Sequence, residues 1–201
     1  MAAHDAIAYP VSQCENRPDK PQPSPSETTA INRLSVLRQC RTAIDDRTAC
    51  NVFLGRALEL LFGNTDFKVG GGYMVANNIA NGLEVQGNAG WTKIGFATDQ
   101  ASLSRAQDLA NSGKPVVAAR LGRLDGAVRH PGHVVLIIPG TAQKYDFDDI
   151  VNGTPVAFGW GNLVAPNAAS FFLDRPDKFF LGCPLSATWQ KPDDVGLYYK
   201  P

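Results

Sequence analysis

The pattern of apolar and polar positions changes abruptly at residue 31. Residues 15–29, ENRPDKPQPSPSETT, contain four prolines within eight positions and almost nothing apolar, so this segment cannot bury enough surface to fold. From Ile31, apolar residues recur at helical spacing through Leu34 and Leu37 to Ile44 and predict a short helix. We therefore expect residues 1–30 to form a flexible Pro-rich arm and residues 31–201 to form a single domain.

The clearest amphipathic segment is DDRTACNVFLGRALELLFG. Asp46 or Thr48 can cap the start of the predicted helix, and Gly63 ends it. Cys50 therefore lies in the first turn of this helix. The apolar stripe consists of Leu54, Ala57, Leu58 and Leu61.

Two later segments, residues 115–121 and 133–138, predict strands that are apolar on both faces, as central strands of a covered sheet are. Helices are expected at about 101–110 and around 73–80, and TPVAFGW at 154–160 predicts a third strand. Because the helices precede the strands, we expect an α+β fold with N-terminal helices packed on a central antiparallel sheet.

Charge narrows the range of partners. Nineteen basic and nineteen acidic residues leave no net charge, whereas binding to nucleic acid or to a membrane surface favours a basic excess. The start of the chain lacks the basic and continuous apolar regions of a signal peptide, and no window resembles a membrane-spanning helix. We expect a protein that is soluble as made, with no nucleic-acid or membrane partner.

The cysteines and histidines do not predict a metal site. The four cysteines show no C-x-x-C spacing, and Pro131 with Gly132 prevents the H-x-x-H pair of His130 and His133 from lying on a helix. We expect neither a metal nor a cofactor. The cysteines are Cys14, Cys40, Cys50 and Cys183.

Cys50 and His133 are the candidate catalytic residues. The first turn of a helix favours a thiolate and offers backbone N–H groups that can bind an oxyanion. A histidine at the start of a strand is held at the rim of the sheet, where it can act as a base. The alternative interpretation is that both are core residues without chemistry.

The segments TACNVFLGRAL, AQDLANSGKPVVAARLG and GHVVLIIPG resemble the papain-like peptidoglycan amidases of the NlpC and CHAP superfamily, especially amidase effectors of type VI secretion systems. The resemblance covers about Thr48 to Gly140. It implies a papain-like fold in which Cys50 is the nucleophile, His133 is the general base, and the backbone N–H groups of Cys50 and Asn51 bind the oxyanion.

In that superfamily a polar residue on the strand after the histidine strand orients the imidazole. If residues 154–162 pair with the histidine strand, Asn162 lies beside His133 and is the expected third residue. Asp146, Asp148 and Asp149 are the alternatives.

The resemblance further implies hydrolysis of an amide bond in peptidoglycan stem peptides or cross-links. Trp91 and Trp160 could line the substrate groove, although core packing is the simpler role for both. Such an effector would act as a monomer in the periplasm of a target cell, delivered without a signal peptide, and a cognate immunity protein would protect the producer. One disulfide among Cys14, Cys40 and Cys183 is then possible.

Two other classes stay open at this point. The same Cys-His pair could serve a protease, deamidase or transglutaminase that acts on a protein. Alternatively, the protein could be a non-catalytic binding protein.

Overall fold

The computed structural model describes residues 50–85, 90–144, 150–151, 154–155, 159–171, 179–189 and 191–201. The expected N-terminal arm, the helix predicted from Ile31, and the capping residues Asp46 and Thr48 lie outside the described residues.

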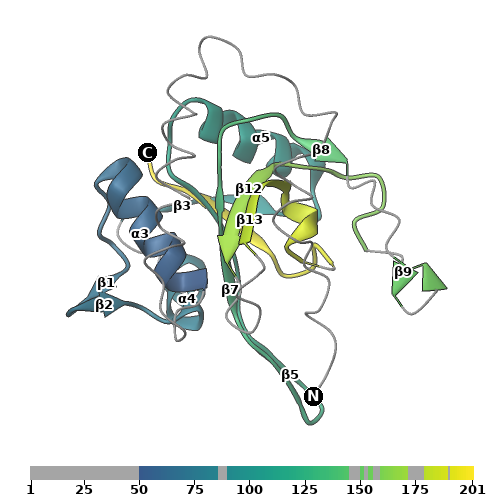
Figure 1. Ribbon diagram of the computed structural model, residues 1–201, viewed down its shortest axis with the longest axis horizontal. Helices are drawn as coiled ribbons and strands as arrows, with labels where there is room; N and C mark the ends of the chain where they lie inside the picture. Colours follow the sequence, from purple (N-terminus) through teal and green to yellow (C-terminus); the bar gives the residue numbers. More distant parts are fainter. Residues whose placement is uncertain are drawn as a thin grey trace.

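A six-stranded antiparallel sheet forms the centre of the molecule, with the strand order β13-β12-β7-β4-β14-β3 (Figure 1). Both strands predicted to be central are internal, because β7 lies between β12 and β4, and β4 lies between β7 and β14. The six strands are β3 (Thr92–Phe96), β4 (Val116–Arg120), β7 (His133–Ile137), β12 (Asn167–Phe171), β13 (Phe179–Pro184) and β14 (Gly196–Tyr199).

The strand predicted at 154–160 is not the neighbour of the histidine strand. Thr154 and Pro155 form a two-residue strand that pairs with Ile150 and Val151, and the neighbour of β7 on that side is β12. The small two-stranded sheets join β1 (Lys68–Val69) to β2 (Gly72–Tyr73), β5 (Arg123–Asp125) to β6 (Val128–His130), β8 (Gln143–Lys144) to β11 (Val164–Ala165), and β9 (Ile150–Val151) to β10 (Thr154–Pro155).

Among the described residues, three α-helices cover the two faces of the sheet: α3 (Cys50–Phe62), α4 (Ala76–Val85) and α5 (Gln100–Asn111). A short 3-10 helix, η4, spans Leu185–Ala187. The expected helix with Cys50 in its first turn is confirmed as α3, and Gly63 follows it with a φ of 64°, a conformation that glycine adopts without strain. The helix predicted around residues 73–80 begins three residues later, because Tyr73 belongs to β2.

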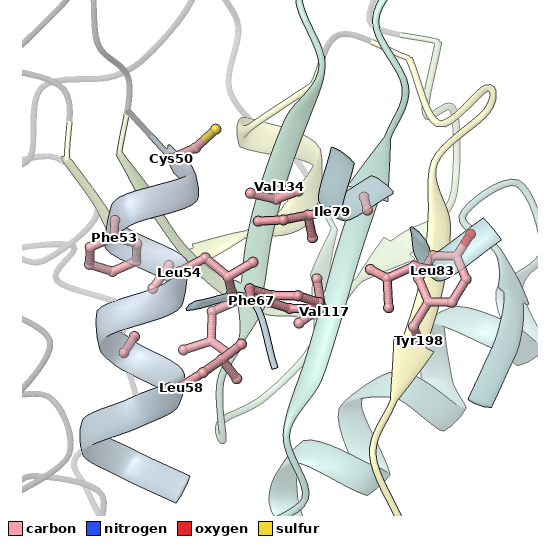
Figure 2. Close-up of a cluster of buried hydrophobic side chains, with 14 of the residues drawn as sticks. Cys50, Phe53, Leu54, Leu58, Phe67, Ile79, Leu83, Val117, Val134 and Tyr198 are labelled. Carbon is pink, nitrogen blue, oxygen red and sulfur yellow. The ribbon is translucent and has the colours of Figure 1, made fainter. Parts of the chain in front are cut away.

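The side chains of β7 alternate between two cores. Val134, Leu136 and Ile138 pack with α3 and α4 (Figure 2), whereas Val135 and Ile137 pack with α5. This alternation is the two-residue period of a strand that is buried on both faces. It explains why the strand consists of a continuous apolar run.

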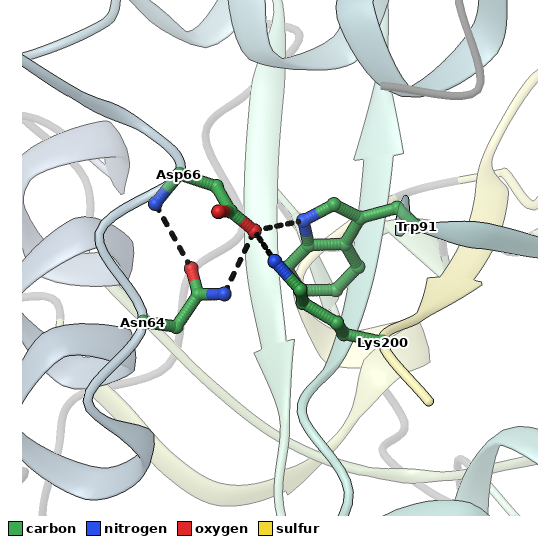
Figure 3. A network of polar contacts seen from close by, with 4 residues as sticks. All are labelled: Asn64, Asp66, Trp91 and Lys200. Carbon is green, nitrogen blue, oxygen red and sulfur yellow. Dashed lines mark hydrogen bonds and ion pairs between the residues drawn. The ribbon is translucent and has the colours of Figure 1, made fainter. Parts of the chain in front are cut away.

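A polar network fixes the end of the chain to the loop after α3 (Figure 3). Asp66 accepts hydrogen bonds from Asn64 Nδ2 at 2.7 Å and from Trp91 Nε1 at 2.9 Å, and it forms an ion pair with Lys200. Burial alone would raise the pKa of Asp66, but these bonds outweigh it and hold the pKa below its ordinary value. The network therefore joins segments that are far apart in the sequence.

These elements define an α+β fold with a mostly antiparallel sheet. Within the part of the chain that the structure describes, no helix is long and apolar enough to span a membrane.

Candidate active site

Cys50 is the first residue of α3 (Figure 2). Its side chain is only 5% exposed. The backbone groups of Val134, Asn51 and Cys50 form hydrogen bonds with the thiol, each of which lowers its pKa. The helix start and the beginning of β7 therefore both present backbone N–H groups to one sulfur atom.

The pKa of Cys50 differs from the sequence expectation. Position at a helix start predicted a lowered pKa, but burial is the largest effect and raises the pKa of the thiol to about 11. The resting side chain is therefore a neutral thiol at physiological pH.

His133 is the first residue of β7 and is 8% exposed. It lies opposite Arg120 of β4 in the sheet register. Its Nε2 atom is 3.2 Å from the Oγ atom of Ser170 on β12, and its ring meets the Trp189 ring edge-on with the centroids 5.1 Å apart. The imidazole is therefore held by a neighbouring strand and by an aromatic side chain.

Burial lowers the pKa of His133 to about 3, and the positive charge of Arg120 acts in the same direction. The imidazole is thus neutral near pH 7, but with a pKa this far below 7 it is a weak base in its resting, buried environment.

Cys50 and His133 approach the same short segment of β7 from different sides. The thiol interacts with the backbone of Val134, the residue that follows His133. Trp189, which contacts the His133 ring, belongs to the core on the α5 side, whereas Cys50 belongs to the core on the α3 side. The start of α3 and the start of β7 are therefore in contact, with the thiol in the core on the α3 side and the imidazole beside the core on the α5 side.

Cys50 and His133 both border the first half of β7. Among the described residues, the ladder between β7 and β12 consists of Ala168 opposite Ile137 and Ala169 opposite Leu136. On the side that faces β12, residues 133–135 of β7 have no partner in this ladder among the described residues. We call this segment the unpaired edge of β7. Cys50 binds the Val134 backbone there, and Ser170 Oγ lies 3.5 Å from the Val134 carbonyl oxygen.

Gly132 allows α4 to approach this edge. A Cβ atom on Gly132 would lie 2.0 Å from Asn77 Oδ1 and 3.2 Å from the Arg120 carbonyl oxygen. Asn77 Oδ1 accepts a hydrogen bond from the Gly122 backbone N–H at 2.8 Å. The absence of a side chain before His133 therefore lets Asn77 hold the end of β4 beside the site.

Asn51, the second expected oxyanion donor, lies next to Cys50 on α3. Its side chain donates a hydrogen bond to the Met74 carbonyl oxygen at 2.9 Å, and its backbone hydrogen bond reaches the thiol. The structure therefore brings Cys50, Asn51 and His133 to one end of the sheet.

Asn162 lies in a different environment. Its side-chain oxygen accepts a hydrogen bond from Lys144 Nζ at 3.0 Å, and the side chain that contacts His133 from the neighbouring strand is that of Ser170. The alternatives Asp146, Asp148 and Asp149 lie outside the described residues.

Both tryptophans proposed for the substrate groove are buried. Trp91 stacks on Phe67 and donates its indole N–H to Asp66. Trp160 donates its indole N–H to the Trp189 carbonyl oxygen at 2.7 Å. Core packing, the simpler role predicted from the sequence, describes the environments of both tryptophans. Trp160 also supports Trp189, the residue whose ring contacts His133.

Cys183 on β13 is disulfide-bonded, and its partner lies outside the described residues. Cys50 is a free cysteine. Within the described ranges, no group of three or more potential metal ligands comes together.

No protein-family model matches the chain, and no curated protein sequence matches it.

Proposed function

We propose that the protein is a cysteine hydrolase that cleaves amide bonds, with Cys50 as the nucleophile and His133 as the general base. The observation that carries this proposal is the contact of the Cys50 thiol with the backbone of Val134, the residue after His133, at the unpaired edge of β7. A thiol at a helix start, an imidazole and backbone N–H donors are the components of this chemistry.

The reaction begins when His133 takes the proton of the Cys50 thiol and the thiolate attacks the carbonyl carbon of the amide. The backbone N–H groups of Cys50 and Asn51, which interact with the thiol in the resting structure, would then bind the oxyanion. His133 returns the proton to the leaving amine, and water hydrolyses the thioester. Because the resting thiol and imidazole are both neutral and buried, substrate binding must open the site before the proton moves.

We propose peptidoglycan stem peptides or cross-links as the substrate. The support is the resemblance of the segments around Cys50, Val117 and His133 to the NlpC and CHAP amidases. An effector of this class would act in the periplasm of a target cell and require an immunity protein in the producer. The disulfide at Cys183 fits an oxidising compartment of this kind.

The decisive experiment is digestion of purified peptidoglycan, followed by mass spectrometry of the released muropeptides. The wild type should release new products, and Cys50→Ala and His133→Ala should each lower the rate by at least about a hundredfold. His130→Ala is the matched control for the second histidine and should keep full activity. Intact peptidoglycan together with a modified protein substrate would replace this proposal with a protein-directed cysteine enzyme.

The burial of Cys50 and His133 favours one competing function, a non-catalytic binding protein in which both are core residues. That function predicts that Cys50→Ala and His133→Ala lower the melting temperature without removing any hydrolytic activity. Measuring the melting temperature beside the digestion assay separates the two functions, because a catalytic role predicts a loss of activity larger than any loss of folded protein.

A further inference from the structure

We propose that strands β12 and β13, which we call the β12–β13 ribbon, move away from β7 at its unpaired edge and thereby open the sheet beside Cys50 and His133. The other end of the contact between β12 and β7 stays closed and serves as the hinge. The catalytic meaning of this motion rests on the proposed function, but the motion itself can be measured without any substrate.

The hinge end of the contact between β7 and β12 is held by three hydrogen bonds. The Ile138 N–H donates to the Asn167 carbonyl oxygen at 2.9 Å. The buried Gln107 side chain of α5 binds both segments, because its Nε2 donates to the Ile138 carbonyl oxygen at 3.0 Å and its Oε1 accepts from the Asn167 N–H at 2.7 Å. We call these three bonds the amide clamp. Breaking buried hydrogen bonds is costly, so this end resists opening.

β12 leaves β7 at a β-bulge. The pairing of β12 with β13 shifts its register between Ala168 and Ala169, and the same two residues form the ladder with β7. A bulge bends the strand that contains it. Beyond the bulge, Ser170 and Phe171 still pair with β13, whereas among the described residues their ladder with β7 has ended. The ribbon therefore stays intact where its contact with β7 is lost.

At the unpaired edge, a side chain takes the place of a neighbouring strand. Continuing the β7–β12 register would put Phe171 opposite Val134. Backbone groups of alternate residues in a strand point to the same side, so the Val134 N–H points toward β12, as the Ile138 N–H does. The Val134 backbone instead binds the Cys50 thiol. Opening this end therefore breaks no backbone ladder between the described residues.

The motion accounts for how two buried groups on different faces of the sheet become accessible. Cys50 belongs to the core on the α3 side, whereas the His133 ring contacts Trp189 on the α5 side. The ribbon borders both groups, because α3 packs on β12 as well as on β7 and Ser170 Oγ lies 3.2 Å from His133 Nε2. Withdrawal of the ribbon therefore uncovers the part of β7 that both groups border.

The first test is hydrogen exchange of single backbone amides, followed by NMR in the full chain. Opening exposes Val134 and leaves the amide clamp closed. The Val134 amide should therefore exchange at least about tenfold faster than those of Ile138 and Asn167, with a weaker dependence on urea. Equal protection of the three amides, lost together as the whole chain unfolds, overturns the proposal.

Alkylation of Cys50 by iodoacetamide measures the same opening from the side of the thiol. Mass spectrometry of the Cys50 peptide should give an opening free energy and a urea dependence that match those of the Val134 amide and lie below those of global unfolding. If Cys50 reacts only when the whole chain unfolds, the ribbon does not move as proposed. This comparison uses the wild type and requires no variant to fold.

Ala57→Cys in a Cys50→Ser background is the matched control for alkylation. Ala57 lies on α3 in the same buried core as Cys50, but more than a helical turn away from the unpaired edge. Its thiol should react only as the whole chain unfolds. Equally easy reaction at both positions would mean that α3 detaches as a unit, which contradicts a motion of the ribbon.

The position of the hinge is tested with Gln107→Ala. Without the amide clamp, the Ile138 and Asn167 amides should exchange at least about tenfold faster. Gln100→Ala is the matched control, because Gln100 also lies on α5 but bonds to Val164 of β11, outside the central sheet. Unchanged exchange in Gln107→Ala would show that the clamp is not the hinge.

These measurements are independent of catalysis. If the wild type cleaves no amide, the proposed function fails, while exchange and alkylation still decide whether the ribbon moves. If the wild type cleaves peptidoglycan but Cys50 becomes accessible only on global unfolding, the motion is disproved and the assignment of Cys50 and His133 stands.

Discussion

At the residue scale, both candidate catalytic side chains have pKa values that favour the neutral form. Burial raises the pKa of Cys50 to about 11 and lowers that of His133 to about 3. A helix start alone predicts a reactive thiolate, so the sequence located the thiol correctly and misjudged its ionisation. Desolvation depends on what surrounds the side chain, and that information is spread over the whole fold.

The buried His133 should make stability depend on pH. Its pKa is about 6.5 when the chain is unfolded and about 3 when it is folded, so the unfolded state binds more protons between these values. Stability should therefore decrease by roughly 1.4 kcal/mol for each pH unit as the pH falls below 6.5. Urea unfolding at pH 7.0, 6.0 and 5.0 measures this slope.

The controls for this slope are His133→Gln, which should reduce it, and His130→Gln, which should keep it. Carboxylates such as Asp66 and Glu59, whose pKa values are lowered in the folded state, lose their contribution only when the pH falls further, through the ordinary range of acidic groups. An unchanged slope in His133→Gln would show that His133 is not buried in its neutral form.

The third polar residue of the site shows the limit of sequence reasoning at this scale. The sequence predicts Asn162 beside His133 only if residues 154–162 pair with the histidine strand. The structure places Ser170 there instead, because β12 is the strand that pairs with β7. The β12 sequence, NAASF, has too few large apolar residues for a strand pattern to be detected.

At the element scale, the strongly patterned segments were predictable. The helices α3 and α5 and the central strands β4 and β7 follow from periodicity and continuous apolar runs. The β5–β6 hairpin, which extends from the end of the sheet (Figure 1), and the C-terminal strands were not predicted. Their residues are mixed in polarity, and long-range pairing rather than local preference determines their conformation.

The contact between α4 and the beginning of β7 should be sensitive to one added methyl group. Gly132→Ala would place a Cβ atom 2.0 Å from Asn77 Oδ1, so Asn77 would have to move and release Gly122. We expect a loss of about 1–3 kcal/mol in the free energy of unfolding, together with reduced hydrolysis if the proposed function is correct. Chemical denaturation measures the first effect.

Gly71→Ala is the control for this substitution, because nothing lies within 4 Å of a Cβ atom at that position. Its stability should change by less than about 0.5 kcal/mol. Equal losses in the two variants would mean that backbone freedom, and not the contact with Asn77, explains the effect at Gly132.

At the scale of the whole molecule, the α+β class followed from the order of helices and strands. The position of the C-terminal strand did not follow from this order, because β14 enters the sheet between β4 and β3. The Asp66 network helps to hold it there through Lys200. A single sequence gives no signal for an ion pair between residues this far apart.

Asp66→Asn should weaken the attachment of the C-terminal residues to the loop after α3. It removes the carboxylate that binds Lys200 and Trp91 (Figure 3), and we expect a loss of about 1–2 kcal/mol, since the pair is only partly buried. Asp194→Asn is the control, because its ion pair with Arg123 is 3.4 Å long and exposed. Thermal unfolding of both variants tests the difference, and a larger effect at Asp194 would contradict this role of Asp66.

The central position of β14 also has a consequence for biosynthesis. Residues 196–199 complete the pairing of both β4 and β3, so the sheet cannot finish assembling while these residues are still inside the ribosome. Folding must then wait for long-range pairing, which is slow compared with helix formation. A nascent chain that already exposes Cys50 and His133 would therefore lack the completed sheet that supports them, and the sheet would be completed only after residues 196–199 have left the ribosome.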